Sequence, residues 1–443
     1  MRGKGVLMSV FSDQQYRTPG SNFIVRLFLS ALAVRVALVV FFQITELDRT
    51  LRLTKDGFFY DRIGKEIAEY YRTDGMSAWP ARVKAVVDFL YEHIVGIVYY
   101  MTGDSMLVMG IINALAGALI PVVVWRMANY ITDVKTSRRA ALWAAWFPTQ
   151  LYYSCLPVRD GLSTLAVTCV FLGVVAFGRK GKAFDKWILL AGLAATAGFR
   201  AYVFSVVTVI IPIAWGLVIV VTRSVHKRRL LRNALILGGL ASAVAVNSGL
   251  LSAFSSGKAA YVTDIDYWNK IRGKMNRGAG ALYSAGEVPE IGESLGDTVS
   301  GIAVGFYFFF LSVNPLEISS FRQAMALPEA LAVLYVIPSI ARGVRRSLRY
   351  HAFSLLPLLL IAGAITFGYS STTTNGGPLM RWRLQVVNVY ILVAAIGFSR
   401  NYYLDGYERG SLAPTDEMNA ARLPLGRPCV RSEVAGSAMN VQA

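Results

Sequence analysis

The chain has 443 residues, of which 55% are hydrophobic, and its mean hydropathy is +0.47. A soluble domain averages about 45–50% apolar residues, and here the excess lies in runs long enough to cross a bilayer, which excludes an ordinary soluble protein. The net charge of +18 could suggest nucleic-acid binding, but the basic residues cluster in short segments between apolar runs, which is typical of membrane topology signals and headgroup contacts.

The N-terminal segment, residues 1–21, is polar and is followed by an apolar run at 23–43. No small-residue cleavage site follows this run, so we expect an uncleaved signal anchor. Arg35 lies inside it. Because a charged group inside a membrane is costly, we expect Arg35 to snorkel or to pair internally with a carboxylate.

Residues 44–103 form a long loop with nearly balanced charge, and the stretch from Lys55 to Gly64 predicts a helix that lies on the bilayer surface. Asp56 and Tyr60 are four residues apart and share one face of this helix. The helix would hold a carboxylate at the boundary between water and lipid. Its predicted apolar stripe consists of Phe59, Ile63, Ile67 and Tyr70.

Nine further spans follow the first one, so the sequence predicts an all-α polytopic membrane protein with about ten transmembrane helices. They are predicted at 105–131, 140–157, 161–178, 187–199, 201–222, 233–253, 324–342, 352–370 and 384–398. Basic clusters at 135–139, 179–186, 223–232 and 342–349 alternate with turns that carry only isolated cations. The positive-inside rule then places both termini in the cytoplasm and the isolated cations outside.

One apolar segment, Gly301 to Val313, is predicted not to cross. Thirteen residues reach only about 20 Å as a helix, short of the hydrocarbon core of about 30 Å. Residues 254–323 therefore form a second large outer loop with an interfacial segment, within a transmembrane domain at 22–400. The tail, residues 401–443, has no periodicity and is predicted to be disordered and cytoplasmic.

The polar groups that could carry chemistry all fall at the predicted outer ends of spans. They are Asp56, Tyr60, Asp61, Arg159, Asp160, Arg200, Arg381 and Arg383. Simpler interpretations stay open: a helix cap and local ion pair at Arg159–Asp160, a turn marker at Arg200, and an interfacial anchor at Arg381 and Arg383. The three cysteines suggest neither a disulfide framework nor a metal site, and the three histidines have no metal-binding spacing.

Gathered in one cavity, these groups would suit a lipid-linked anionic donor and an acceptor hydroxyl. A carboxylate can act as general base on the hydroxyl. Arginine forks bind phosphate oxygens and can stabilise the charge that builds on a leaving phosphate. A polyprenyl tail would lie in a groove between spans.

The order of these motifs resembles the GT-C glycosyltransferase superfamily, in particular bacterial members akin to the protein O-mannosyltransferases and the lipid A aminoarabinose transferases. The resemblance covers about residues 20–400. It is carried by Arg35 in the first span, Asp56-x-x-x-Tyr60, the run from Ile111 to Gly117, Pro148 to Tyr153, Leu156-Pro157-Val158-Arg159-Asp160, Pro315-Leu316-Glu317, Leu327-Pro328-Glu329-Ala330, and Arg381-Trp382-Arg383.

The resemblance implies that Asp56 is the catalytic acid of the first loop and Asp160 that of the second, with Arg200, Arg381 and Arg383 contacting phosphate. The family often has two adjacent acids in the first loop, whereas here Gly57 follows Asp56 and the nearest other acid is Asp61. Which of the two is the base therefore stays open, as does the use of a divalent cation, Mg²⁺ or Mn²⁺. Asn388 stands where the family commonly has prolines.

The expected function is a glycosyltransferase that moves sugar from a polyprenyl-phosphate donor to a glycan, lipid or protein acceptor, with inversion. The expected location is the bacterial inner membrane, with the active site on the extracytoplasmic face. Two alternatives remain: a polymerase or ligase of lipid-linked glycans, and a transporter or flippase for them. No nucleic-acid partner is expected.

Overall fold

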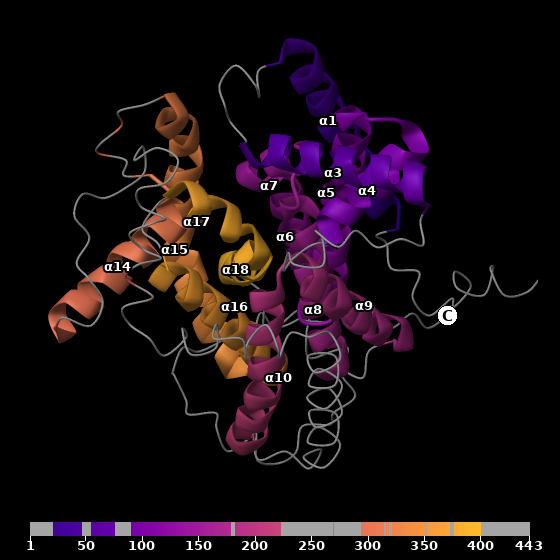
Figure 1. The fold of residues 1–443 in the computed structure, drawn as a ribbon. Helices are drawn as coiled ribbons and strands as arrows, with labels where there is room; N and C mark the ends of the chain where they lie inside the picture. Colours follow the sequence, from indigo (N-terminus) through magenta and orange to yellow (C-terminus); the bar gives the residue numbers. More distant parts are fainter. Residues whose placement is uncertain are drawn as a thin grey trace, which may run out of the picture. The chain divides into compact units, whose positions relative to one another are not determined.

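The computed structural model describes residues 21–46, 55–75, 90–178, 182–222, 269, 294–313, 316, 318, 321–350, 352–372 and 376–399. Within these ranges every regular element is a helix (Figure 1). Six described helices are long and apolar enough to cross a membrane, which confirms the all-α polytopic membrane fold. They belong to α1 (Ser21–Thr45), α5 (Met106–Asn129), α8 (Asp160–Gly178), α10 (Ala201–Thr222), α15 (Phe321–Tyr350) and α16 (Ala352–Thr372).

Shorter helices complete the described fold. They are α3 (Lys55–Asp74), α4 (Leu90–Thr102), α6 (Val134–Trp146), α7 (Pro148–Tyr153), α9 (Ala183–Phe199), α14 (Leu295–Leu311), α17 (Gly376–Trp382) and α18 (Leu384–Phe398). Several predictions lie outside the described residues: the N-terminal segment before residue 21, the span at 233–253, the basic cluster at 223–232, the middle of the second loop, and the tail at 401–443.

The predicted single span at 140–157 is wrong, because the chain breaks there into α6 and α7. Phe147 separates the two helices with an extended ψ of 118°. Pro148 disfavours the helical conformation for the residue before it, and it is tolerated at the first position of the next helix, where its missing N–H is not needed. The run is apolar, as predicted, but Pro148 ends α6 before it and begins α7.

The helix predicted in the first loop is confirmed as α3, although its buried face matches the predicted apolar stripe only in part. Ile67 of the stripe is buried, but Phe59 is 45% exposed, and Tyr60, which is outside the stripe, is buried. The reason is packing against α4, which is close enough to need glycines: a Cβ on Gly64 would lie 2.3 Å from Val95, and one on Gly96 would lie 2.3 Å from Ile67. In Figure 1, α3 lies across the direction of α10.

Arg35 neither snorkels nor meets a carboxylate. Its side chain is fully buried in α1, where Nε donates to Ser154 Oγ at 2.9 Å and the two terminal nitrogens donate to the carbonyls of Ala31 and Ala145 at 3.1 and 3.0 Å. The break between α6 and α7 lies between Ala145 and Ser154, so partners from both sides of it are available. Arg35 therefore ties α1 to the region of the break.

α14 is longer than expected, because it begins at Leu295 and has 17 residues. At 1.5 Å per residue it reaches about 26 Å, still short of a hydrocarbon core of about 30 Å. Its last turn lies beside Arg383, whose Nη1 donates to the carbonyls of Phe309 and Phe310.

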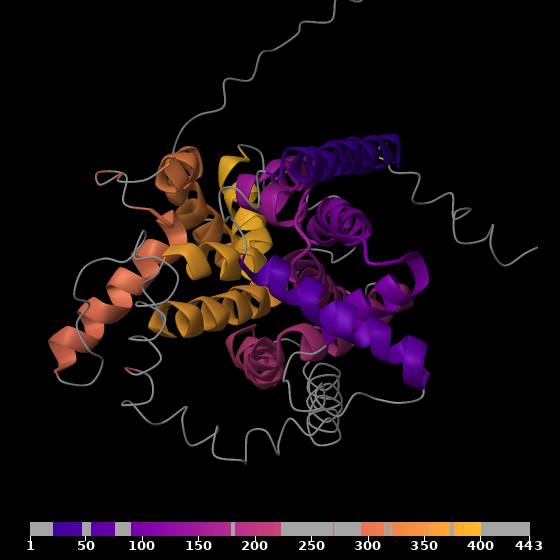
Figure 2. The same ribbon diagram turned by 45° about the horizontal axis from the view of Figure 1, so that its top comes forward.

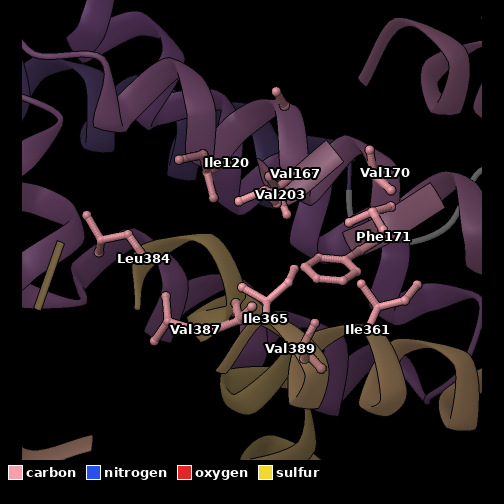
Figure 3. Packing of buried hydrophobic residues seen from close by; sticks show 14 of the residues in the cluster. Ile120, Val167, Val170, Phe171, Val203, Ile361, Ile365, Leu384, Val387 and Val389 are labelled. Atoms are coloured by element: carbon pink, nitrogen blue, oxygen red, sulfur yellow. The ribbon is translucent and has the colours of Figure 1, made fainter. Parts of the chain in front are cut away.

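One apolar core joins the two halves of the chain. Figures 2 and 3 show helices α5, α8, α10, α16 and α18 gathered around it, with side chains from all five pointing inward. These include Ile120, Val167, Phe171, Val203, Ile361, Ile365 and Val389. Because the halves share this core, residues more than 200 positions apart can be held at fixed distances.

Two described basic residues, Arg126 and Arg346, lie at the ends of their helix pairs away from the isolated cations Arg200 and Arg383. Arg126, near the end of α5, pairs with Asp185 at the start of α9, with Nε 2.6 Å from Oδ1. Arg346 donates to the carbonyls of Ile396 and Gly397 at the end of α18, whereas Arg383 stands at its beginning. These two pairs agree with the predicted alternation of charge, of which residues 179–181 and 223–232 lie outside the described residues.

Candidate functional site

The helix hairpin α8–α9 brings the first two polar groups together. Asp160 begins α8 and Arg200 directly follows α9. The two helices run antiparallel, because Gly173 of α8 faces Leu189 while Gly192 of α9 faces Ala166. Arg200 Nη2 donates to Asp160 Oδ1 at 2.8 Å, and both side chains are almost fully buried.

Arg381 on α17 connects this pair to the first loop. Its Nη2 and Nε donate to Asp160 Oδ2 at 2.6 and 3.0 Å, and its Nη1 donates to Asp56 Oδ2 at 2.5 Å. The guanidinium also lies over the ring of Tyr153, 5.6 Å from its centroid. Arg381 therefore bridges two carboxylates that are 104 positions apart, one at the start of α3 and one at the start of α8. We call Asp56, Asp160, Arg200 and Arg381 the carboxylate–arginine cluster.

The two carboxylates of the cluster differ sharply in exposure. The Asp160 side chain is 1% exposed and accepts from both arginines, whereas the Asp56 side chain is 48% exposed. Asp160 is thus neutralised on both oxygens and has no access to solvent. Asp56 is the carboxylate that a substrate can reach.

Tyr60 lies one turn after Asp56 on α3 and is buried. Its ring packs edge-on against Tyr91 of α4, with centroids 4.8 Å apart. Burial raises the pKa of Tyr60 to about 12, and the nearby positive charge of Arg159 opposes that shift. The Tyr60 hydroxyl therefore stays protonated near neutral pH, and it can donate a hydrogen bond but cannot act as a base.

A chain of hydrogen bonds through two tyrosine hydroxyls extends the cluster toward the C-terminal helices. Arg200 Nη1 donates to Tyr202 at 3.1 Å, the Tyr202 and Tyr369 hydroxyls are 2.9 Å apart, and Tyr369 donates to Gln385 at 2.8 Å. The Tyr369 ring stacks on Trp382, with centroids 4.9 Å apart and an angle of 26° between the planes. One tyrosine thus supports Arg200 through a hydrogen-bond chain and also packs on the residue next to Arg381.

Arg383 is not in this cluster. It is 2% exposed and pairs with Glu329 of α15. The other oxygen of that carboxylate accepts from the backbone N–H of Thr149 at 2.7 Å and from the Thr149 hydroxyl. Together with its bonds to the end of α14, these contacts make Arg383 the centre of a second, closed cluster.

Asp61 and Arg159 lie outside the carboxylate–arginine cluster. Asp61 is held by Lys65 on its own helix and by the hydroxyl of Tyr99 on α4, each at 2.8 Å. Arg159 is half-buried and close enough to influence Tyr60 and Asp160 electrostatically. Of the eight residues predicted from sequence, four therefore meet directly through side-chain bonds, two flank them, and Asp61 and Arg383 have other partners.

A small, mostly apolar pocket lies beside the segments that contain Asp56 and Asp160. It is lined by Val39, Phe42, Gln43, Glu46, Phe58, Met106, Gly110, Cys155, Leu156 and Pro157. Phe58 follows Asp56 by two residues and Pro157 precedes Asp160 by three, so the pocket borders both. Among the described residues, no group of three His, Cys, Asp or Glu side chains is placed to hold a metal ion.

Some residues of the site were not singled out from sequence. Three of them lie in apolar helices, where a tyrosine is usually an ordinary core residue: Tyr202, Tyr369 and Gln385. Glu329 carried a usable signal, because an acid in an apolar span usually has a partner and a purpose. Its partner, Arg383, is 54 positions away, and no local pattern links the two.

The fold and the cluster define an integral membrane protein that gathers carboxylates and arginines at one end of its helices. A family model of dolichyl-phosphate-mannose-protein mannosyltransferases matches residues 88–252, a segment that includes Asp160 and Arg200. The match confirms the resemblance to the GT-C superfamily and indicates a membrane glycosyltransferase of the mannosyltransferase type. A comparison with curated protein sequences found no match.

Proposed function

We propose that this protein transfers a sugar from a polyprenyl-phosphate donor to an acceptor hydroxyl, with Asp56 as general base. The observation that carries the proposal is the exposed carboxylate of Asp56, held 2.5 Å from a guanidinium that is itself anchored on buried Asp160. A base and a phosphate-binding group therefore lie side by side, so that an acceptor hydroxyl and a donor phosphate bound to them would be neighbours.

In the proposed reaction, Asp56 takes the proton of the acceptor hydroxyl while the hydroxyl oxygen attacks the anomeric carbon of the sugar. The bond from that carbon to the phosphate oxygen breaks, and its electron pair leaves with the polyprenyl phosphate. Arg381 and Arg200 stabilise the charge that builds on the phosphate. Attack opposite the leaving group inverts the anomeric centre. Asp160 assists as a positioning residue, because it holds both guanidinium groups.

We place this reaction on the extracytoplasmic face of a bacterial inner membrane, with both termini in the cytoplasm. The positive-inside rule supports this side, because the sequence places its basic clusters in alternate connections and the isolated cations in the others. We place the first part of the polyprenyl chain in the pocket beside Phe58 and Pro157, since apolar residues of α1 and α5 line it. The acceptor is a glycan, lipid or protein hydroxyl.

The test is transfer of label from radiolabelled polyprenyl-phosphate sugars by the purified full-length protein. We expect Asp56→Asn to lower kcat by about 10²–10⁴-fold, the usual contribution of a general base. The matched control is Glu66→Gln, which removes the same charge from an exposed position of the same helix. Full activity of Asp56→Asn would exclude Asp56 as the base.

The same experiment separates the alternatives. A polymerase or ligase would lose activity in Arg381→Ala but tolerate Asp56→Asn, because it depends less on a carboxylate base. A flippase would move lipid-linked glycan across vesicles without forming a new glycosidic bond.

A further inference from the structure

Arg381 has two different partners on the two edges of its guanidinium group. The edge formed by Nε and Nη2 rests on Asp160 at 3.0 and 2.6 Å, and Nη1 alone reaches Asp56. Asp160 has a further arginine partner in Arg200. The inner edge is therefore fixed, whereas the outer contact depends on one nitrogen and one carboxylate.

The outer contact is also the exchangeable one. The Asp56 side chain is 48% exposed and that of Arg381 is 20% exposed, whereas Asp160 is 1% exposed. An ion pair at an exposed position contributes little and is open to competition from other anions. A buried pair is much harder to break, because separation leaves an uncompensated charge.

A donor phosphate and Asp56 need the same nitrogen. Arginine binds phosphate best through two parallel N–H groups, but the Nε–Nη2 edge is occupied by Asp160. Nη1 is the nitrogen of Arg381 whose partner, Asp56, is exposed, so it is the one for which a ligand arriving from solvent can compete. A carboxylate bonded to that nitrogen repels the phosphate, and while it is bonded it is poorly placed to accept a proton from an acceptor.

We propose that Asp56 and the donor phosphate bind Arg381 Nη1 in turn. In the empty enzyme, Asp56 is held by Arg381. The donor phosphate replaces it and so releases the carboxylate toward the acceptor hydroxyl. The donor therefore binds before the base becomes available, and substrate addition is ordered. This inference rests on the proposed function and adds to it the order of binding.

The test measures binding of polyprenyl monophosphate to the full-length protein in detergent, with no acceptor present. Removal of a competing exposed ion pair is expected to tighten binding about two- to fivefold in Asp56→Asn. Glu66→Gln, with the same loss of charge on α3, should bind like the wild type. Asp56→Ser should repeat the gain, since serine also suits the first turn of a helix, and it provides a second variant if the first folds poorly.

A double-mutant cycle assigns the gain to Arg381. In an Arg381→Ala background, Asp56→Asn should bring no tightening, because the shared guanidinium is gone. A gain that persists in that background would overturn the exchange, as would equal or weaker binding by Asp56→Asn and Asp56→Ser. If those variants still lose transfer, the base assignment survives and only the order of binding fails. Lack of any binding by the wild-type protein would overturn both proposals.

Discussion

Arg381 and Arg383 are two residues apart, and yet they belong to clusters of opposite character. Arg381 bridges one buried and one exposed carboxylate, so part of its hydrogen-bonding capacity faces solvent. Arg383 is sealed between Glu329, Thr149 and the last carbonyls of α14. The difference teaches that an arginine at a membrane boundary is a candidate for ligand binding only when one of its partners can be exchanged.

Loss of Arg383 should have the largest effect, and that effect should be on folding. Arg383→Met leaves Glu329 buried without its cation, which costs about 3–5 kcal/mol of unfolding free energy. Thermal unfolding in detergent, followed by tryptophan fluorescence, measures this loss. The double variant Arg383→Met/Glu329→Leu should regain most of the stability and keep transfer activity. If the double variant folds but transfers nothing, Arg383 contacts substrate after all.

Substitution of Arg381 should mainly affect catalysis. Arg381→Lys keeps one positive charge but cannot bond both carboxylates through a planar fork. Loss of such a preorganised donor set is expected to lower kcat by about 10²–10³-fold. Steady-state kinetics with the labelled donor measure this change. A loss of thermal stability as large as that of Arg383→Met would show that the two arginines do not differ in role.

Tyr369→Phe should lower stability and donor affinity by an intermediate amount, because Tyr369 is linked to Arg200 through Tyr202. It keeps the stack on Trp382 but removes the hydroxyl between Tyr202 and Gln385. An unsatisfied buried group costs about 1–3 kcal/mol, and with less support for Arg200 we expect a higher KM for the donor. Thermal unfolding and donor titrations measure both.

The matched control for Tyr369→Phe is Tyr390→Phe. The Tyr390 hydroxyl lies 2.7 Å from that of Thr366, again between α16 and α18, but it lies outside the hydrogen-bond chain from Arg200 through Tyr202 and Tyr369. It should lower stability to a similar degree and leave the KM for the donor unchanged. An equal rise in KM for both variants would mean that the effect is general loosening of the helix pair rather than positioning of Arg200.

Asp61→Asn should have the smallest effect. Asp61 bonds Lys65 and Tyr99 outside the carboxylate–arginine cluster, and an exposed pair of this kind contributes about 0.3–0.5 kcal/mol, or about a twofold change in an equilibrium. Transfer assays should therefore show at most a change of that size. A loss as large as that of Asp56→Asn would move the base to Asp61.

Much of the fold follows from the sequence, because long apolar runs leave few choices in a membrane. The bounds of α8, α10 and α18 lie within a residue or two of the predicted ones. The error at 140–157 arose at Pro148, whose effect on the preceding residue outweighed a continuous apolar run. The buried face of α3 was predicted only in part, at Ile67, because the position of Tyr60 is set by contact with α4, and the sequence of α3 alone contains no record of that neighbour.

The candidate site was only partly predictable. Sequence placed Asp56, Asp160, Arg200 and Arg381 at the same predicted side of the membrane, and the structure brings them together. It did not distinguish Arg381 from Arg383, although residues two apart on a helix do not share a face. That spacing was a usable sign that the two side chains point to different surroundings. Long-range partners such as Glu329 and Tyr369 depend on tertiary packing.

The ion pair across the α8–α9 hairpin also constrains length. Asp160 precedes one helix and Arg200 follows the other, so their contact depends on how many residues lie in each. One inserted residue would rotate everything after it by about 100° and shift it by about 1.5 Å, which would carry the guanidinium away from the carboxylate. A single extra alanine within either helix would therefore separate Arg200 from Asp160 without changing any of the residues that form the site.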